Sequence, residues 1–237
     1  MGRVKDAYNY DAMVPGGRLH WLFLLITIIV GVWFIAAELL LVYAAVKFRR
    51  KEGVRAAYLP GRSLRAMSVV LIPCAIVLCL DLVIDGVAAP VWHNIKEEIP
   101  ESKHLVRITG GQWFWQFTLP GADGKLDTAD DVTSVNELHV PAGEIVQFEL
   151  TAKDVLHSFF VPQLRLKQDA IPGRRIKGWF EVTKTGKFEI VCAEICGLLH
   201  TNMRGTMVAE SPEAYQKWLQ SLIPPVASTP QEEGEEG

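Results

Sequence analysis

Two long apolar segments near the N-terminus constrain this chain more than any other feature of its sequence. Residues 19–46 read LHWLFLLITIIVGVWFIAAELLLVYAAV, and residues 67–92 read MSVVLIPCAIVLCLDLVIDGVAAPVW. A helix needs about 20 apolar residues to cross a bilayer, so each segment is long enough to span it. The first segment begins too late and runs too long for a typical signal peptide. The sequence therefore predicts an N-terminal transmembrane hairpin of two helices.

The loop 47–66 between these segments sets the predicted orientation. It carries seven Lys and Arg residues against a single acid, Glu52. Short loops as basic as this one stay in the cytoplasm. We therefore expect the N-terminal segment 1–18, and everything after the second helix, to be extracytoplasmic. The protein is predicted to sit as a multi-pass protein in a bacterial-type inner (cytoplasmic) membrane.

The rest of the chain reads as a linker, one β domain, a helix and a tail. Residues 93–103 form a polar linker. Residues 104–210 contain short runs rich in Val, Ile, Phe and Trp, separated by Gly and Pro turns, which indicate an antiparallel sandwich or barrel. Ser-Pro-Glu then opens a short helix over 211–222. The acidic tail 223–237 has almost nothing to bury and is predicted to be disordered.

Charge and cysteine usage exclude some classes of function. From His93 onward the chain has 14 basic and 21 acidic residues, a net charge of −7. Nucleic-acid binding requires a basic footprint, and this region has none. An acidic exterior suits a basic protein partner, although acidic solvated faces are common. No C-x-x-C-H occurs, so we expect no covalent haem on this chain and a separate protein as electron donor.

The stretch VCAEICGLLHTNM, residues 191–203, holds two cysteines, a histidine and a methionine. A disulfide between Cys192 and Cys196 is one interpretation, because an extracytoplasmic location permits it. Zinc is a second, with Cys192, Cys196, His200 and the distant His157 of VLHSFFVP as a tetrahedral set. Zinc gains little from the thioether of Met203, however. Thiolate, thioether and imidazole together favour copper.

The number of cysteines bears on the number of copper ions. A blue-copper site uses one Cys, two His and a weak axial Met. Two thiolates can instead bridge two copper ions, with His157 and His200 each terminating one of them. Met203 and a backbone carbonyl would then supply weak axial bonds. The cluster is interpreted most simply as a binuclear copper site.

The segments CAEICGLLHTNM, DVLHSFFVPQLRLKQDAIPGR and GQWFWQF together resemble subunit II of cytochrome c oxidase, and the resemblance covers most of the chain. It implies an all-β cupredoxin-like Greek-key sandwich that carries the CuA centre. It also implies six copper ligands, namely the thiolates of Cys192 and Cys196, the imidazoles of His157 and His200, the thioether of Met203 and the main-chain oxygen of Glu194. The quinol oxidases of this family lack these ligands.

The same resemblance assigns roles to four further groups. Trp113 in GQWFWQF would be the point at which electrons enter, although a strand that buries alternate aromatic residues is the alternative. The Glu194 side chain would bind magnesium at the interface with the catalytic subunit, unless it is a solvated carboxylate. Asp169 and Arg174 would contact that subunit, or else form an ordinary ion pair within a turn.

Several acidic side chains remain outside these assignments. Glu38, Asp81 and Asp85 are costly inside a membrane unless they face protein or water. Asp81 and Asp85 share a helix face, which should meet a neighbouring subunit; hydrogen bonding between helices is the alternative to a proton path. The second helix begins without the glutamate that many members of the family carry there. The acidic turn 123–131 could bind calcium, but a solvated hairpin is the expectation.

The predicted function is that of the CuA-containing subunit II of a haem–copper terminal oxidase. Such a subunit accepts electrons from an extracytoplasmic donor such as cytochrome c and passes them to catalytic subunit I for oxygen reduction. Its partners would be subunit I, other oxidase subunits, the donor and the lipid bilayer. The alternatives are the same module in a nitric oxide reductase, a membrane-tethered copper-binding or copper-delivery protein, and a structural β domain with a disulfide.

Overall fold

The computed structural model describes residues 18–55, 60–121 and 123–222. The chain divides into two compact units, one built on the two long helices and one on the β domain from Ile99 onward. The predicted N-terminal segment, up to residue 17, and the predicted tail 223–237 lie outside the described residues.

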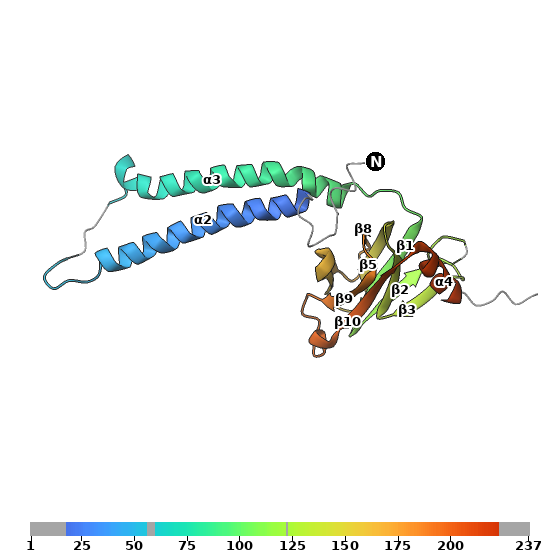
Figure 1. The fold of residues 1–237 in the computed structure, drawn as a ribbon. Helices are drawn as coiled ribbons and strands as arrows, with labels where there is room; N and C mark the ends of the chain where they lie inside the picture. The colour runs from blue at the N-terminus through green and yellow to red at the C-terminus, as the bar shows by residue number, and fades with distance from the viewer. Residues whose placement is uncertain (1–17, 56–59, 122, 223–237) are drawn as a thin grey trace, which may run out of the picture. The chain divides into compact units, whose positions relative to one another are not determined.

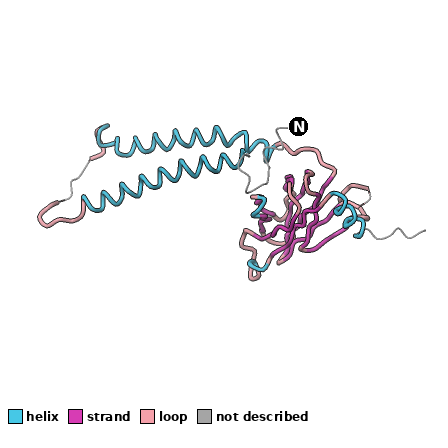
Figure 2. Tube along the Cα trace, in the orientation of Figure 1, coloured by secondary structure: helices cyan, strands magenta, loops and turns pink. Residues whose placement is uncertain are grey.

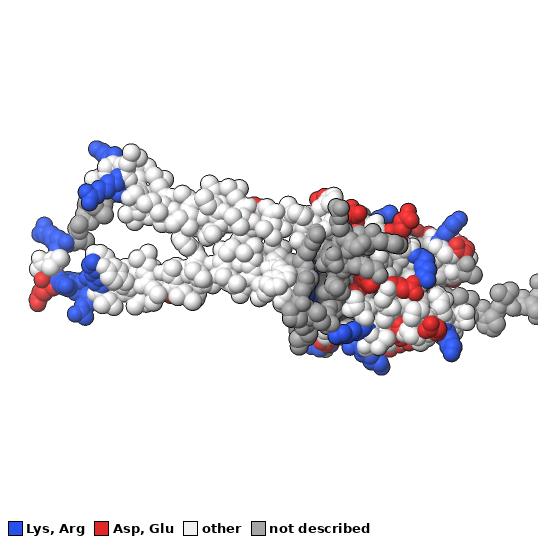
Figure 3. All heavy atoms as spheres, turned by 45° about the horizontal axis from the view of Figure 1, so that its top comes forward, with Lys and Arg blue, Asp and Glu red and all other residues white. Residues whose placement is uncertain are grey.

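The first unit is a hairpin of two long helices, α2 (Arg18–Lys47) and α3 (Leu64–Trp92), which contact each other (Figure 1). Both are long and apolar enough to cross a membrane. Helix α3 begins three residues earlier than the apolar pattern predicts, because the hydroxyl of Ser63 caps it by accepting the N–H of Ala66 at 3.2 Å. Basic side chains gather at the loop end of the hairpin, whereas its flanks are almost uncharged (Figure 3). The predicted linker begins with a π-helical segment, η1 (His93–Glu97).

The second unit is a sandwich of two five-stranded sheets, as predicted (Figure 2). In spatial order, the first sheet contains β3 (Val132–Val135), β2 (Phe114–Leu119), β1 (His104–Gly111), β5 (Ile145–Ala152) and β8 (Ile176–Glu181). The second sheet contains β4 (Glu137–Pro141), β10 (Arg204–Glu210), β9 (Gly186–Cys192), β6 (His157–Val161) and β7 (Leu166–Ala170). A short 3-10 turn, η2 (Pro162–Leu164), follows β6, and another, η3 (His200–Asn202), precedes β10.

The sequence predicts an antiparallel sandwich or barrel, but one strand pair in each sheet is parallel. Strand β1 pairs with β5 in parallel, and β10 pairs with β4 in parallel. Parallel neighbours cannot be joined by a tight hairpin and need a longer crossover. Here the chain crosses between the two sheets, so strands that are distant in sequence become neighbours with the same direction.

One such crossing occurs at Asn136, inside the stretch SVNELHV that reads as a single strand. Asn136 has a positive φ of 59°, and it separates β3 in the first sheet from β4 in the second. Asparagine tolerates this left-handed conformation better than most residues. Its side-chain oxygen accepts the N–H of Trp115 at 2.8 Å, and its own N–H donates to the Trp115 carbonyl at 2.8 Å. These bonds hold the crossing against β2.

The core lies between the two sheets and is rich in aromatic side chains. Trp115 is fully buried, with its ring edge-on to Phe159 at 5.3 Å between centroids. Phe117 lies edge-on to Phe159 at 6.5 Å, and Phe148 stacks on Phe180 at 6.1 Å. Such pairs contribute about 0.5–1.5 kcal/mol each beyond the area they bury.

The acidic turn 123–131 is held by the domain's own groups. Asp127 accepts two hydrogen bonds from Arg107, at 2.5 and 3.0 Å, and one from Arg175 at 3.1 Å. The hydrogen bonds from these two guanidinium groups lower the pKa of Asp127 to about 2. The hydroxyl of Thr128 donates to Asp130 at 2.7 Å. Asp127 is therefore engaged by two arginines of the same domain.

Helix α4 (Pro212–Leu222) closes the domain against β4 by ring contacts. Trp218 stacks on His139 with centroids 4.2 Å apart and planes 9° from parallel. Tyr215 lies edge-on to His104 at 5.3 Å. Both nitrogens of His139 face carboxylates, Glu210 at 2.6 Å and Glu137 at 2.9 Å, which fixes the ring plane for stacking.

Trp218→Ala is therefore expected to lower the free energy of unfolding by about 1–3 kcal/mol, because it removes the stacked ring and the apolar area under it. Urea unfolding of the detergent-solubilised chain, followed by tryptophan fluorescence and far-UV circular dichroism, measures this. Gln216→Ala, at an exposed position of the same helix, is the matched control and should change stability by less than about 0.5 kcal/mol. Equal stability of both variants would contradict the assigned contact.

Candidate metal centre

The sulfur and imidazole groups meet at one end of the sandwich because two strands of the second sheet begin or end there. Strand β6 begins with His157, and β9 ends with Cys192. The two strands are paired in this sheet, and the N–H of Ala193 donates to the Ser158 carbonyl at 3.0 Å. The loop 193–203 then returns to β10, with the N–H of Cys192 donating to the Met203 carbonyl at 3.2 Å.

The two cysteine sulfurs form the middle of this cluster. Their Sγ atoms are 3.8 Å apart, whereas a disulfide bond measures about 2.05 Å, so both are free thiols. Each sulfur has an imidazole of its own. The Sγ atom of Cys192 is 3.9 Å from Nδ1 of His157, and that of Cys196 is 3.5 Å from Nδ1 of His200.

The two remaining predicted donors lie beside the same sulfurs. The Sδ atom of Met203 is 3.8 Å from Sγ of Cys196, and this methionine is buried. The main-chain oxygen of Glu194 is 3.2 Å from Sγ of Cys192. The structure thus brings all six predicted donors together, and the ligand atoms of His157, Cys192 and Cys196 lie within 4.8 Å of one another.

Burial affects the protonation of Cys196 in the metal-free chain. Burial, together with the neighbouring Cys192, raises the pKa of the Cys196 thiol. A raised pKa keeps this group protonated at neutral pH, so a metal ion that binds it must displace a proton. A free thiolate at Cys196 is therefore disfavoured unless a cation binds it.

The orientation of His157 is fixed by groups that the sequence analysis missed. Its Nε2 atom lies 2.8 Å from Oδ1 of Asp154, which leaves Nδ1 for the sulfur side. Burial by itself would raise the pKa of Asp154. Hydrogen bonds from the His157 ring and from the main-chain N–H groups of Gln112 and Val155 outweigh this effect, so the pKa of Asp154 is lowered overall. A Cβ at Gly110 would lie 3.0 Å from Cδ2 of His157, so this glycine makes room for the ring. The spacing D-x-x-H in KDVLHS is the signal that could have identified Asp154.

Trp113 lies against the loop that carries the cysteines. Its indole N–H donates to the Cys196 carbonyl at 3.3 Å, and Nε2 of Gln112 donates to the same oxygen at 2.8 Å. A Cβ at Gly197 would approach both side chains, at 3.2 Å from the Trp113 ring. Residues two apart on a strand share a face, but β2 begins only at Phe114. Trp113 is therefore half-exposed while Trp115 is buried, so that of these two tryptophans only Trp115 fits the strand-core alternative.

Other predicted site residues are not brought together. Asp169 on β7 and Arg174 in the following turn form no ion pair with each other in the described part of the chain. The Glu194 side chain is half-exposed and belongs to no cluster of carboxylates among residues 18–55, 60–121 and 123–222.

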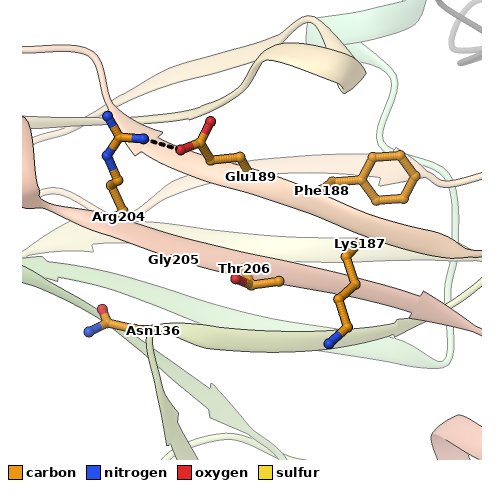
Figure 4. A pocket seen from close by; sticks show the side chains of 7 residues that line it. All are labelled: Asn136, Lys187, Phe188, Glu189, Arg204, Gly205 and Thr206. Carbon is orange, nitrogen blue, oxygen red and sulfur yellow. Dashed lines mark hydrogen bonds and ion pairs between the residues drawn. The ribbon is translucent and has the colours of Figure 1, made fainter.

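A hollow of about 560 Å³ lies elsewhere on the second sheet, across β9 and β10 (Figure 4). Its lining includes Lys187, Glu189, Arg204 and Asn136, and Arg204 forms an ion pair with Glu189 (Figure 4). None of the six predicted donors contributes to it. The candidate metal centre is therefore the thiol and imidazole cluster and not this hollow.

The fold and the site define a class, that of membrane-anchored β-sandwich proteins with a buried site of paired thiols and imidazoles. The family model for the periplasmic domain of cytochrome c oxidase subunit II matches residues 104–211. An alternative cytochrome c oxidase subunit 2 of Bradyrhizobium diazoefficiens is 34% identical over 217 residues, which is 81% of this chain and 76% of that protein. Cytochrome c oxidase subunit 2 of Cereibacter sphaeroides is 29% identical over 233 residues, 86% of this chain and 75% of that protein. The chain belongs to the cytochrome c oxidase subunit II family.

Among solved structures, the periplasmic domain of subunit II of the Bradyrhizobium japonicum cytochrome oxidase is similar, with a TM-score of 0.48 and 26% identity. The matched region covers 53% of this chain and 96% of the solved domain. Family membership confirms the predicted resemblance, and the chain is subunit II of a haem–copper oxidase. Two apolar helices and a domain of the periplasmic type fit a membrane protein with an extracytoplasmic domain.

In the metal-free, reduced chain, Cys196 is expected to react with iodoacetamide about tenfold or more slowly than an unfolded cysteine at pH 8. The thiolate is the nucleophile, and each unit by which the pKa rises removes about tenfold of it. Peptide mass spectrometry after timed alkylation measures the rate at Cys196 separately from the other cysteines. The same chain in urea is the control, and equal rates in the two states would contradict the burial and the raised pKa.

Proposed function

We propose that this chain is the CuA subunit of its oxidase, which accepts electrons from an extracytoplasmic donor such as cytochrome c and passes them to the catalytic subunit. The observation that carries the proposal is the pairing of each buried thiol with its own imidazole around two sulfurs 3.8 Å apart. Membership in the oxidase family supports it.

The donor set fits copper better than zinc. Two thiols, two imidazoles and a thioether are soft or borderline ligands, which favour copper, and Met203 would add little to a zinc site. His157 and His200 would each bind one ion, Cys192 and Cys196 would bridge them, and Met203 and the Glu194 main-chain oxygen would complete the set. When bound, two copper ions bridged in this way supply one-electron transfer with little change in bond length.

The protein's own contribution is to hold these donors rigidly and to exclude water. His157 is fully buried and is held from behind by Asp154 at 2.8 Å, so its ring cannot rotate freely. The strand pairing at Ala193 and Cys192 anchors the start of the donor loop, and Met203 anchors its end. Ligands held in one arrangement need little rearrangement during electron transfer.

Trp113 is the proposed point at which electrons enter. Its indole is half-exposed, and its N–H donates directly to the carbonyl of Cys196. The ring therefore joins the protein surface to a proposed ligand through a single hydrogen bond. Glu194 is proposed to bind magnesium with its side chain at the contact with the catalytic subunit, and Asp169 and Arg174 to belong to the same contact.

The other functions receive less support. The relatives found are oxidase subunits, which favours oxygen reduction over nitric oxide reduction for the partner. A copper-delivery protein has no need of an aromatic side chain hydrogen-bonded to the ligand loop. A purely structural disulfide does not fit sulfur atoms 3.8 Å apart.

The full chain, purified after copper loading, is expected to bind two copper ions per chain and to be purple, because thiolate bridges give intense charge-transfer absorption. Metal analysis and electron paramagnetic resonance test this, and one unpaired electron shared by two nuclei gives more than four hyperfine lines. Cys192→Ser with Cys196→Ser is the control that should lose copper while remaining folded. One copper per chain with a four-line spectrum would refute the binuclear proposal.

Trp113→Phe is expected to slow electron uptake from the natural donor by orders of magnitude, because it removes the indole N–H that reaches the Cys196 carbonyl. Copper content and donor affinity should stay nearly unchanged. Trp115→Phe is the matched control. It replaces a buried indole by the smaller phenyl ring and should mainly lower the free energy of unfolding, by about 1–3 kcal/mol. Rapid mixing of each oxidase variant with donor at fixed ionic strength compares them. A near-native rate for Trp113→Phe would mean that electrons enter elsewhere.

A further inference from the structure

Cations gather on both arms of the hairpin at its loop end (Figure 3). Four of them lie within residues 47–51, directly after the apolar run of α2, and the others lie further along the loop and just before the apolar run of α3. These cations, named here the basic loop surface, are Lys47, Arg49, Arg50, Lys51, Arg55, Arg62 and Arg65. The positive charge therefore begins where the apolar part of each helix ends.

Aromatic side chains place this surface at the boundary of a membrane. The ammonium group of Lys47 donates to the hydroxyl of Tyr43 and lies 4.9 Å from the centroid of the Tyr43 ring. It also lies 5.8 Å from the centroid of the Phe48 ring, and Phe48 is exposed. Tyrosine rings gather at the headgroup level of a bilayer, and lysine side chains extend along apolar surface to the same level. Lys47 therefore marks the headgroup level, and the cations that follow it lie at that level or beyond it.

The chain's own carboxylates do not neutralise the basic loop surface. Residues 47–66 contain seven cations and one acid, Glu52, which gives a net charge of +6. All seven cationic side chains are exposed, and none forms an ion pair with a carboxylate among residues 18–55, 60–121 and 123–222. Like charges this close to one another repel. An anionic partner from outside the chain would relieve that repulsion.

We propose that the basic loop surface binds the headgroups of anionic phospholipids in the cytoplasmic leaflet of the membrane. That leaflet has a negative surface potential, and each Lys or Arg near it strengthens binding about fivefold. Clusters of roughly four to eight Lys and Arg beside a transmembrane helix are typical of such binding. The proposal goes beyond electron transfer and requires only that the hairpin crosses a membrane; it does not depend on copper or on the electron donor.

Position selects a lipid over a free anion in solution. The cations lie beside exposed apolar side chains, Phe48 on one arm and Leu64 on the other. A free phosphate gains nothing from these side chains, whereas a phospholipid can place its acyl chains against them and its phosphate beside the cations. The other end of the hairpin differs, because residues 93–103 contain two Lys against three Glu. The charge of the hairpin therefore favours anionic lipid at one leaflet only.

Native mass spectrometry of the full chain in a neutral detergent tests the proposal. Dioleoylphosphatidylglycerol is compared with dioleoylphosphatidylcholine, which has the same acyl chains but no net charge. We expect the first phosphatidylglycerol to bind about tenfold or more tightly than the first phosphatidylcholine, and this preference to fall as salt is added. Equal affinities for the two lipids would overturn the proposal. Inorganic phosphate that binds as tightly as phosphatidylglycerol would overturn it as well, because the partner would then be a free anion.

Two triple variants, each of which removes three positive charges, test whether the loop is the site. Arg49→Gln with Arg50→Gln and Lys51→Gln removes the densest part of the basic loop surface and should reduce the preference for phosphatidylglycerol about tenfold or more. The matched control replaces three exposed lysines of the β domain and should leave the preference nearly unchanged. Its substitutions are Lys167→Gln, Lys187→Gln and Lys217→Gln. Equal losses in the two variants would show that net charge alone attracts the lipid, which contradicts a defined surface.

A second experiment locates the lipid in a bilayer. The full chain is reconstituted into phosphatidylcholine membranes that contain a small fraction of phosphatidylglycerol with a photoreactive headgroup, and labelled peptides are identified after illumination. Labelling should fall on residues 47–55 and 60–66, and it should drop about tenfold or more in the triple variant of the loop. Labelling centred on residues 93–103 instead would refute the proposal. Copper content is measured in the same samples, so that a failure of the proposed function is recognised separately from a failure to bind lipid.

Discussion

The packing of two β-sheets around Trp115 is the interaction on which the rest of the β domain depends. The buried ring contacts Phe159 and lies 6.1 Å, edge-on, from His157, so it supports the wall of the candidate metal centre. Its main chain is bonded to Asn136, where the chain passes from one sheet to the other. One residue thus links the sheet crossing, the core and a proposed ligand. The hydrophobic effect supplies the stability, and the backbone bonds supply the geometry.

The sequence predicts the kinds of structure well and their connections poorly. Hydropathy and length identify both helices, and alternation with turn residues identifies the strands. The stretch SVNELHV reads as one strand because nothing local shows that Asn136 takes a positive φ and changes sheets. Parallel pairing of β1 with β5 also depends on long-range order, which a periodic pattern does not carry.

The candidate site divides in the same way. Cys192, Cys196, His200 and Met203 are close in sequence, so their spacing carries the chemistry, and His157 is added as an imidazole ligand near the end of a separate predicted strand, which the family resemblance also implies. Gln112 and Gly110 act through contacts with segments that are 40 or more residues away, and single-sequence reasoning gives them no weight. A period-two pattern does not predict that Trp113 is half-exposed and Trp115 is buried, because this difference depends on the residue at which β2 begins.

All proposed donors except His157 belong to a single segment of twelve residues, which is tied down at Cys192 and Met203 by main-chain bonds. Such a loop can open while both sheets remain intact, since only a few of its bonds cross to other elements. Local openings of this kind cost less free energy than global unfolding. Exchange of a bound metal with solution would then follow the lifetime of one loop and not that of the fold. A domain stable to denaturant could still release and recapture its metal on a much shorter timescale.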